Sequence, residues 1–251
     1  MPALLANCGS WVGISKTTIK TLNDLQSLYC RLIYSCPEST PIPSLRGEAG
    51  LLSMDFRIMS EQVCLVSRIM NMRDKDEPTY AEEVLSEQLA MGWEGLANEV
   101  VGICQKVGLP NACEEFVGRD KVKEAMMYCH LKELKEEYSM KKLKHLQNTD
   151  LRFMQDYMKL ASLEDSRVEF RYRVGMLDNR VNMGKKYKNK ECPHCIPGRE
   201  QGVEESSQHW LDCEAYQELR RGMDPETILK DRVLYIRRLQ LLRIELEKTV
   251  M

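Results

Sequence analysis

Apolar residues recur at intervals of three and four along most of the chain, which is the period of amphipathic helices. This pattern predicts helices over residues 19–33, 56–70, 80–91, 95–107 and 120–146. The apolar positions of the first are Leu22, Leu25, Tyr29, Leu32 and Ile33. Ser162 resembles the N-cap of a further helix through Leu177, and Asp224-Pro225 resembles the start of a C-terminal helix. Convincing strand alternation is missing, so the sequence predicts a mostly α protein with helical bundle-like segments.

Prolines, glycines and charged runs mark the ends of these helices. Cys36-Pro37 ends the first one, and the three prolines of residues 37–48 predict an extended loop there. Gly108 followed by Pro110 predicts a helix end, and the acidic stretch that closes at Pro78 predicts a linker.

The composition is that of a soluble globular protein, with 43% hydrophobic and 29% charged residues. An apolar run long enough for a membrane span is lacking, and the apolar opening MPALLANCG has no basic segment typical of a signal peptide. We therefore expect an intracellular protein, in either the nucleus or the cytoplasm.

The chain contains ten cysteines. Seven are scattered singly within the apolar patterns: Cys8, Cys30, Cys36, Cys64, Cys104, Cys113 and Cys129. Secreted disulfide scaffolds are short and cysteine-dense, so this scatter favours reduced thiols that pack as small hydrophobic side chains. The other three, Cys192, Cys195 and Cys213, cluster in a polar segment and need another explanation.

The segment CPHCIPGREQGVEESSQHWLDC has the spacing Cys-x2-Cys-x13-His-x3-Cys, formed by Cys192, Cys195, His209 and Cys213. Zinc takes four sulfur or nitrogen ligands in a tetrahedron. Two cysteines on a tight turn can share one ion, and a histidine and a cysteine four positions apart share one face of a helix. The pattern predicts a small C-terminal zinc knuckle that holds one zinc ion, followed by a terminal helix.

Two alternatives stay open for this segment. The four residues can be ordinary side chains of a surface loop, although so polar a stretch offers no apolar face to pack against. His194 is an alternative ligand, but its neighbours are a proline and a ligand cysteine, which favours an outward orientation. Four protein ligands leave no position for water, so the predicted site is structural and not catalytic.

Positive charge gathers just before the zinc motif. Residues 120–190 contain 17 Lys and Arg against 11 Asp and Glu, whereas both flanking parts are net acidic. Eight basic residues close this block: Arg167, Arg171, Arg173, Arg180, Lys185, Lys186, Lys188 and Lys190. Tyr172 and Tyr187 are interleaved with them. Cations attract phosphates and aromatic rings stack on bases, so the stretch predicts a surface for RNA or single-stranded DNA. The alternative is a solvated helix end and loop.

Motifs that indicate catalysis are missing from the sequence. Adjacent aspartates, which hold the catalytic metals in the aromatic-x-Asp-Asp motif of reverse transcriptases, do not occur. A glycine-rich phosphate loop, a His-Glu-x-x-His motif and a nucleophile elbow do not occur either. We therefore expect that the protein is not an enzyme.

Two groups of motifs follow each other along the chain. Near the N-terminus, a tryptophan and a leucine-rich helix precede a Ser-Thr-Pro and a Glu-x-Gly turn, on Trp11, Leu22, Leu25, Gln26, Ser39, Thr40, Pro41, Glu48 and Gly50. Further on, RYRVGML leads through KYKNKECPHC to QHWLDC. The first group resembles the segment after the polymerase palm in non-LTR (LINE-type) retrotransposon reverse transcriptases. The second resembles the C-terminal part of the same polyproteins, where an Arg-rich helix leads into a Cys-Cys-His-Cys knuckle. Residues 75–160 match only loosely.

The resemblance implies a truncated or co-opted element that lacks the polymerase and endonuclease domains. It divides the chain into a thumb-like helical segment (1–77), a helical middle region (78–160), a basic helix and loop (161–190), the zinc knuckle (191–216) and the C-terminal helix (217–251). Our hypothesis is a non-catalytic, zinc-containing, nucleic-acid-binding remnant of such a reverse transcriptase. The alternatives are a helical protein-interaction module with a zinc staple, with a protein partner on exposed helix faces, and a pseudogene product without selected function.

Overall fold

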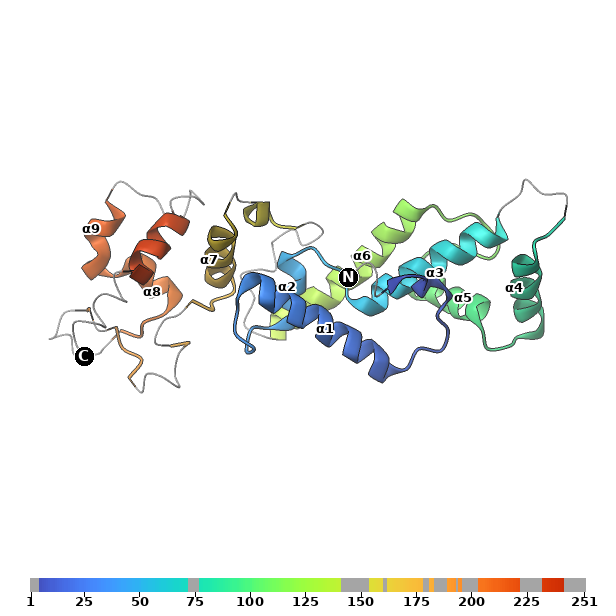
Figure 1. Cartoon of the computed structure of the whole chain (residues 1–251), viewed down its shortest axis with the longest axis horizontal. Coiled ribbons are helices and arrows are strands. Elements are labelled where there is room, and N and C mark those ends of the chain that lie inside the picture. The colour runs from blue at the N-terminus through green and yellow to red at the C-terminus, as the bar shows by residue number, and fades with distance from the viewer. Residues whose placement is uncertain are drawn as a thin grey trace. The chain divides into compact units, whose positions relative to one another are not determined.

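The computed structural model describes residues 5–71, 77–140, 154–159, 162–177, 181–182, 189–192, 194–195, 203–221 and 232–241. It is mostly helical, which confirms the predicted fold class (Figure 1). Within the described residues there is no sheet, and one isolated antiparallel bridge joins Glu191 and Glu204. Among the helices described, none is both long and apolar enough to cross a membrane.

The described residues form a succession of helices along the chain. The α-helices are α1 (Lys16–Tyr34), α2 (Ile42–Glu48), α3 (Met54–Met70), α4 (Tyr80–Met91), α5 (Leu96–Val107), α6 (Arg119–Met140), α7 (Leu163–Arg173), α8 (Ser207–Asp212) and α9 (Gln217–Arg220). Among the described residues, short 3-10 helices include η2 (Cys8–Ser10), η4 (Asp156–Lys159) and η5 (Glu214–Tyr216), and residues 232–241 are helical as well.

The chain forms two compact units. Unit 1 consists of Met1–Tyr29 and Ala49–Phe153, and unit 2 of Cys30–Glu48 and Met154–Met251. This division is coarser than the five segments predicted from the sequence, and it groups α2 with the C-terminal half of the chain.

The core of unit 1 lies between α3, α5 and α6. Phe56, Val66, Val100 and Met126 are fully buried there, together with further aliphatic side chains of the three helices. The predicted helices over 56–70, 80–91 and 95–107 correspond to α3, α4 and α5. Gly108 has φ 73° and ends α5, because glycine adopts this left-handed conformation without the strain of a side chain. The predicted helix over 120–146 is described as far as Met140, and its last residues lie outside the described part.

Only part of the apolar stripe that predicts α1 is buried. Leu22 is buried, whereas Leu25, Tyr29 and Leu32 are exposed. Polar residues take part in the buried face instead, and Gln26 donates a hydrogen bond from Nε2 to the carbonyl of Leu52 at 2.8 Å. The period of the helix is therefore predicted correctly, but the face that packs is rotated from the expected one.

The prediction of an extended loop over residues 37–48 is wrong, because α2 occupies its second half. Pro43 lies in the first turn of α2, where a missing backbone N–H costs no hydrogen bond and the fixed φ suits the helix. Leu45 is fully buried, so packing stabilises this short helix.

Unit 2 contains α7 and the C-terminal core. Ser162 caps α7 as predicted, with its side chain accepting a hydrogen bond from the backbone N–H of Asp165 at 3.4 Å. The helix ends at Arg173 and not at Leu177, since Gly175 has φ 69°. Phe170 is fully buried and stacks on Tyr34 with ring centroids 4.6 Å apart.

The C-terminal core is formed by α8, η5 and the helix over residues 232–241. Trp210, Tyr235 and Ile236 are almost completely buried in it, and Val233 and Leu239 pack beside them. The apolar pattern of the predicted terminal helix is thus confirmed where the structure describes it, while the predicted start at Asp224-Pro225 lies outside the described residues.

Candidate metal centre

The four predicted ligands come from a bridged pair of segments and from α8. Residues 190–192 run antiparallel to residues 203–205: the N–H of Cys192 donates to the carbonyl of Val203 at 2.8 Å, and the N–H of Glu205 donates to that of Lys190 at 2.8 Å. This pairing fixes the first cysteine at the base of the turn that contains Cys195.

A capped helix positions the other two ligands. The side chain of Ser206 accepts a hydrogen bond from the N–H of His209 at 3.1 Å and so starts α8. Cys213 follows the last residue of α8, and its N–H donates to the carbonyl of His209 at 2.7 Å. One helical turn therefore places the imidazole of His209 and the third sulfur donor, Cys213, on the same side.

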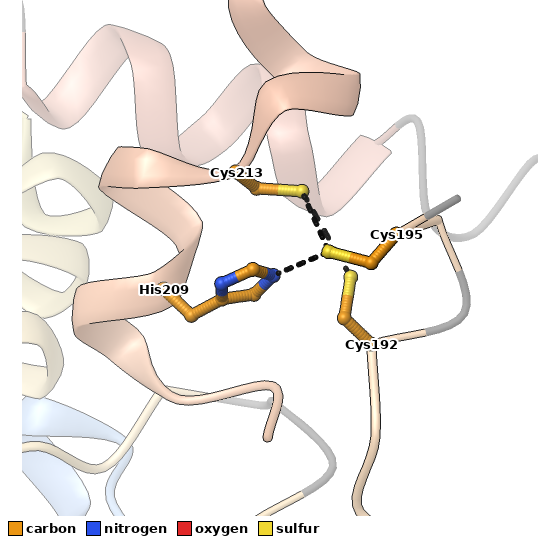
Figure 2. A group of neighbouring side chains, drawn as sticks. All are labelled: Cys192, Cys195, His209 and Cys213. Atoms are coloured by element: carbon orange, nitrogen blue, oxygen red, sulfur yellow. Dashed lines mark hydrogen bonds between the residues drawn. The ribbon is translucent and has the colours of Figure 1, made fainter. Parts of the chain in front are cut away.

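The four side chains converge on one point (Figure 2). Their donor atoms all lie within 4.8 Å of one another. Cys213 Sγ is 3.9 Å from both Cys192 Sγ and Cys195 Sγ, and Cys195 Sγ is 3.3 Å from His209 Nε2. A zinc tetrahedron with Zn–S bonds of about 2.3 Å has S–S edges of about 3.8 Å. The sulfur atoms are thus too far apart for disulfides and at the spacing of zinc ligands.

All ten cysteines of the chain are free thiols. This confirms the interpretation of the seven scattered cysteines as reduced side chains, of which four are buried and three are partly buried. Free thiols at the cluster also fit a metal site, because zinc binds cysteine as the thiolate.

Burial shifts the pKa values of Cys192, His209 and Cys213. It raises the pKa of the Cys192 thiol to about 12, with a further contribution from the neighbouring Cys213. It also raises the pKa of Cys213 and lowers that of His209. At neutral pH the imidazole is therefore neutral, with a lone pair free to bind a metal, and the thiols carry protons that a bound zinc ion displaces.

Apolar side chains pack around the cluster of predicted ligands. Cys192 and Cys213 are buried, and Trp210 and Leu211 pack with them in the C-terminal core. Tyr235 donates a hydrogen bond from its hydroxyl to the carbonyl of Trp210 at 2.5 Å, which ties α8 to the helix over residues 232–241. The candidate metal centre is therefore part of the C-terminal core and not of a solvated loop.

His194 lies outside the group of converging donor atoms. Its ring packs against that of Tyr216 with centroids 5.5 Å apart. The structure therefore favours His209 over His194 as the nitrogen ligand. The sequence predicts an outward orientation for His194, whereas its ring packs on Tyr216.

The three arginines of α7 make contacts within unit 2. Arg167 donates from Nε to the carbonyl of Ile33 at 2.8 Å, and Arg171 donates to the carbonyl of Ser35. Arg173 binds the fully buried carboxylate of Glu48 through two hydrogen bonds, at 2.8 and 3.1 Å. These contacts position α7 against residues 33–48.

The rest of the predicted nucleic-acid stretch is partly described. Lys190 is exposed next to the metal cluster. Arg180, Lys185, Lys186, Lys188 and Tyr187 lie outside the described residues. Tyr172 is partly buried, with the Arg232 guanidinium 5.0 Å from its ring centroid. Whether the stretch contacts nucleic acid stays a prediction.

Three buried carboxylates, those of Glu48, Glu169 and Glu205, were not predicted from the sequence. Besides Glu48, Glu169 is fully buried and pairs with Arg232. Burial raises the pKa of Tyr157, and so does the adjacent carboxylate of Glu48, to which Tyr157 donates its hydroxyl at 2.8 Å. The sequence carries no signal for these pairs, because their members lie far apart along the chain.

Comparisons with protein-family models, with curated proteins and with solved structures find no match to this chain.

Proposed function

We propose that the C-terminal part of unit 2 is a zinc-stabilised module that presents a lysine-rich segment to single-stranded nucleic acid. The observation that carries this proposal is the convergence of Cys192, Cys195, His209 and Cys213 within 4.8 Å. The lysine-rich segment ends at Lys190, two residues before the first of these ligands. A zinc ion bound by the four side chains would fix the end of that segment, while phosphate attraction would supply affinity.

The proposed contact surface is narrower than the eight basic residues of the sequence prediction. Arg167, Arg171 and Arg173 already bind backbone carbonyls or a buried carboxylate within unit 2. Nucleic-acid contact is therefore assigned to Arg180 and to the lysines of residues 185–190. The exposed Lys190 is the described member of this set.

The proposal includes an origin and the absence of catalysis. The motif order supports descent from the C-terminal part of a LINE-type reverse transcriptase, and the sequence lacks the adjacent aspartates that such a polymerase needs to hold its metals. We expect no templated product in a primer-extension assay with magnesium and zinc.

Salt dependence of RNA binding tests the proposal. Each phosphate contacted on a single strand contributes about −0.7 to the slope of log K against log salt, so about four contacts give a slope near −3. We expect this slope for the zinc-loaded chain with a mixed-sequence RNA of about 16 nucleotides, the upper end of common site sizes. Replacing Lys185, Lys186, Lys188 and Lys190 with Ala should reduce the slope to about −0.7, the contribution of the remaining Arg180.

A matched control removes the same charge elsewhere. Lys16, Lys20, Lys132 and Lys135 are exposed on α1 and α6, and their replacement with Ala should leave the slope unchanged. Cys213→Ser should weaken binding with all lysines in place. Equal slopes for the two quadruple variants would eliminate the nucleic-acid surface and leave the second candidate.

The second candidate is a helical protein-interaction module in which zinc staples the C-terminal helix. The exposed apolar side chains of α1, with Leu32 at 67% exposure, favour it. Such a module should show no salt-dependent affinity for RNA, with or without the lysines of residues 185–190.

A further inference from the structure

A cavity of about 670 Å³ lies in unit 1, and the residues of the zinc motif belong to unit 2. Its walls are η2, one face of α3 and the segment that leads into α6. The volume is within the range of about 300–1,000 Å³ that small-molecule sites occupy. The residues that matter for its chemistry are Arg57, Glu61, Arg68, Phe116 and Arg119.

The wall formed by η2 is held against α3 by direct backbone contact. A Cβ atom on Gly9 would lie 2.8 Å from the carbonyl oxygen of Glu61, so only glycine permits this approach. Gly9 and Cys8 are buried as a result. The cavity therefore has a preformed wall, since the close approach leaves η2 little freedom to move toward α3.

The cavity carries an excess of positive charge. Arg119 and Glu61 form an ion pair with N and O atoms 3.0 Å apart, which leaves this pair neutral. Within the described part of the chain, the side chains of Arg57 and Arg68 make neither a hydrogen bond nor an ion pair. Two guanidinium groups therefore line the cavity without a carboxylate of their own, and a guanidinium fork suits the oxygen atoms of a phosphate.

Arg57 and Arg68 are the first and the last of the α3 residues that line the cavity. Arg57 and Arg68 are eleven residues apart on α3, which corresponds to about 16 Å along the helix axis. A compact anion suits one of the two arginines, whereas an elongated ligand can contact both. The ligand that fits is elongated, with an anionic group at one end.

An aromatic ring lies near the Arg68 end. Ser67 accepts a hydrogen bond from the N–H of Val117 at 2.7 Å and donates one to its carbonyl at 3.3 Å. This contact places Phe116, the preceding residue, beside the last turn of α3. The Phe116 side chain is 66% exposed, which is unusual for phenylalanine and leaves its ring accessible for stacking.

We propose that this cavity binds a nucleoside phosphate, with the phosphate on Arg57 and the base stacked on Phe116 beside Arg68. Stacking of a base on an aromatic ring tolerates any base, so the site assigns the ligand class without choosing among the bases. The planar guanidinium of Arg68 adds a second flat surface for the ring. The proposal does not depend on the zinc site or on the proposed function, because all its residues belong to unit 1.

Calorimetry of the zinc-loaded full chain with ADP, adenosine and pyrophosphate tests the proposal. ADP engages both ends and should bind at least tenfold more tightly than adenosine or pyrophosphate, which engage one end each. Phe116→Ala should weaken ADP by about tenfold, the value of one lost stacking contact, and leave pyrophosphate unchanged. Arg57→Gln should weaken ADP and pyrophosphate by about tenfold or more and leave adenosine unchanged.

Lys132→Gln is the matched control for charge, since Lys132 is exposed on α6 outside the cavity lining and should leave ADP binding unchanged. Phe116 is exposed, so its replacement tests the site even where Arg57→Gln perturbs the fold. Three results would overturn the proposal: no ADP binding at millimolar concentration, equal affinity for ADP and pyrophosphate, or binding of an oligonucleotide through these residues without binding of ADP.

Discussion

The cores of the two units differ in the residue types that they bury. In unit 1, Phe56, Val66, Val100 and Met126 form an aliphatic and aromatic core among three helices. In unit 2, the fully buried set includes three carboxylates, those of Glu48, Glu169 and Glu205. The C-terminal core also contains buried thiols of the candidate metal centre.

This difference determines what each unit needs in order to fold. Burial of apolar surface stabilises without a demand for a particular partner. A buried carboxylate needs a cation with good geometry, and a thiolate cluster needs a metal ion. We therefore expect unit 1 to be stable by itself, while the stability of unit 2 depends on zinc and on two arginines. Residue-resolved measurements on both units test this difference.

Zinc removal should have the largest effect. Structural zinc contributes on the order of 10 kcal/mol of folding free energy in small zinc domains. Chelation or Cys213→Ser should therefore abolish hydrogen-exchange protection over residues 203–221 and 232–241, and leave protection in α3, α5 and α6 intact. Elemental analysis should give one zinc per wild-type chain and none after Cys192→Ser with Cys213→Ser.

Cys129→Ser is the control for this experiment, because Cys129 is a partly buried thiol on α6 in unit 1. It should leave the zinc content unchanged. Zinc retained by the double variant, or protection in residues 203–221 that survives chelation, would contradict the metal centre and with it the contrast between the units.

Loss of the Arg173 pair should have the second largest effect. Arg173→Ala removes both hydrogen bonds to Glu48 and leaves a fully buried charge that, among the described side chains, keeps the hydrogen bond from the Tyr157 hydroxyl. Breaking such a pair costs about 3–5 kcal/mol. The free energy of opening measured by exchange in α7 should fall by that amount, while α5 stays unchanged.

Glu48→Gln in the Arg173→Ala background provides the control. It removes the uncompensated charge, so part of the lost stability of α7 should return. If the double variant is as unstable as the single one, the cost comes from lost packing of the arginine stem and not from the buried charge.

The elements with strong local signals could be predicted from the sequence, and so could the ligand set. The helical period gives α3, α4 and α5, Ser162 gives the start of α7, and the spacing of the three cysteines and His209 gives the candidate centre. These features depend on residues close together in sequence or on ligand chemistry with a fixed spacing.

Features that depend on distant partners could not be predicted in this way. The buried face of α1 follows from Leu52 and other residues beyond the next helix, which no period within α1 reveals. The arginines of α7 have the composition of a nucleic-acid surface, but α2 and residues 33–35 supply acceptors for them. Charge in a sequence therefore indicates a partner without showing whether that partner belongs to the same chain.

One buried thiol in each unit should react about 100-fold more slowly than an open cysteine. Burial raises the pKa of Cys30 in unit 2 and of Cys113 in unit 1 to about 11, from an ordinary value of 9. At pH 8 both should therefore present about 100-fold less thiolate to iodoacetamide than an open cysteine. The pKa of each thiol is higher in the folded than in the unfolded chain. The stability that the buried, protonated thiol contributes is therefore fully present below pH 9 and is lost as the pH rises through about 11.

Zinc chelation should change the alkylation rates of the two thiols differently, which peptide mapping of the alkylated chain measures. Cys113 should stay slow, because unit 1 keeps its core. Cys30 should become faster, because its unit contains the metal centre. Equal rates with and without chelator would mean that zinc stabilises only the C-terminal core and not the whole of unit 2.

The smallest expected effect comes from one helix cap in each unit. Thr79 caps α4 in unit 1 by accepting from the N–H of Glu82 at 3.3 Å, and Ser162 caps α7 in unit 2 in the same way. Each replacement with Ala should cost about 1 kcal/mol, since a cap satisfies a local backbone donor whatever the core is made of.

The two cap variants should act on separate sets of amides. Thr79→Ala should lower exchange protection in α4 and α5, and Ser162→Ala in α7, with zinc present in both cases. Thr79→Asp and Ser162→Asp keep an acceptor for the same N–H and should retain wild-type protection. A cap variant of unit 1 that lowers protection in α7 would show that the units unfold together. Their different cores would then set one shared stability, because the loss of either core would open both units.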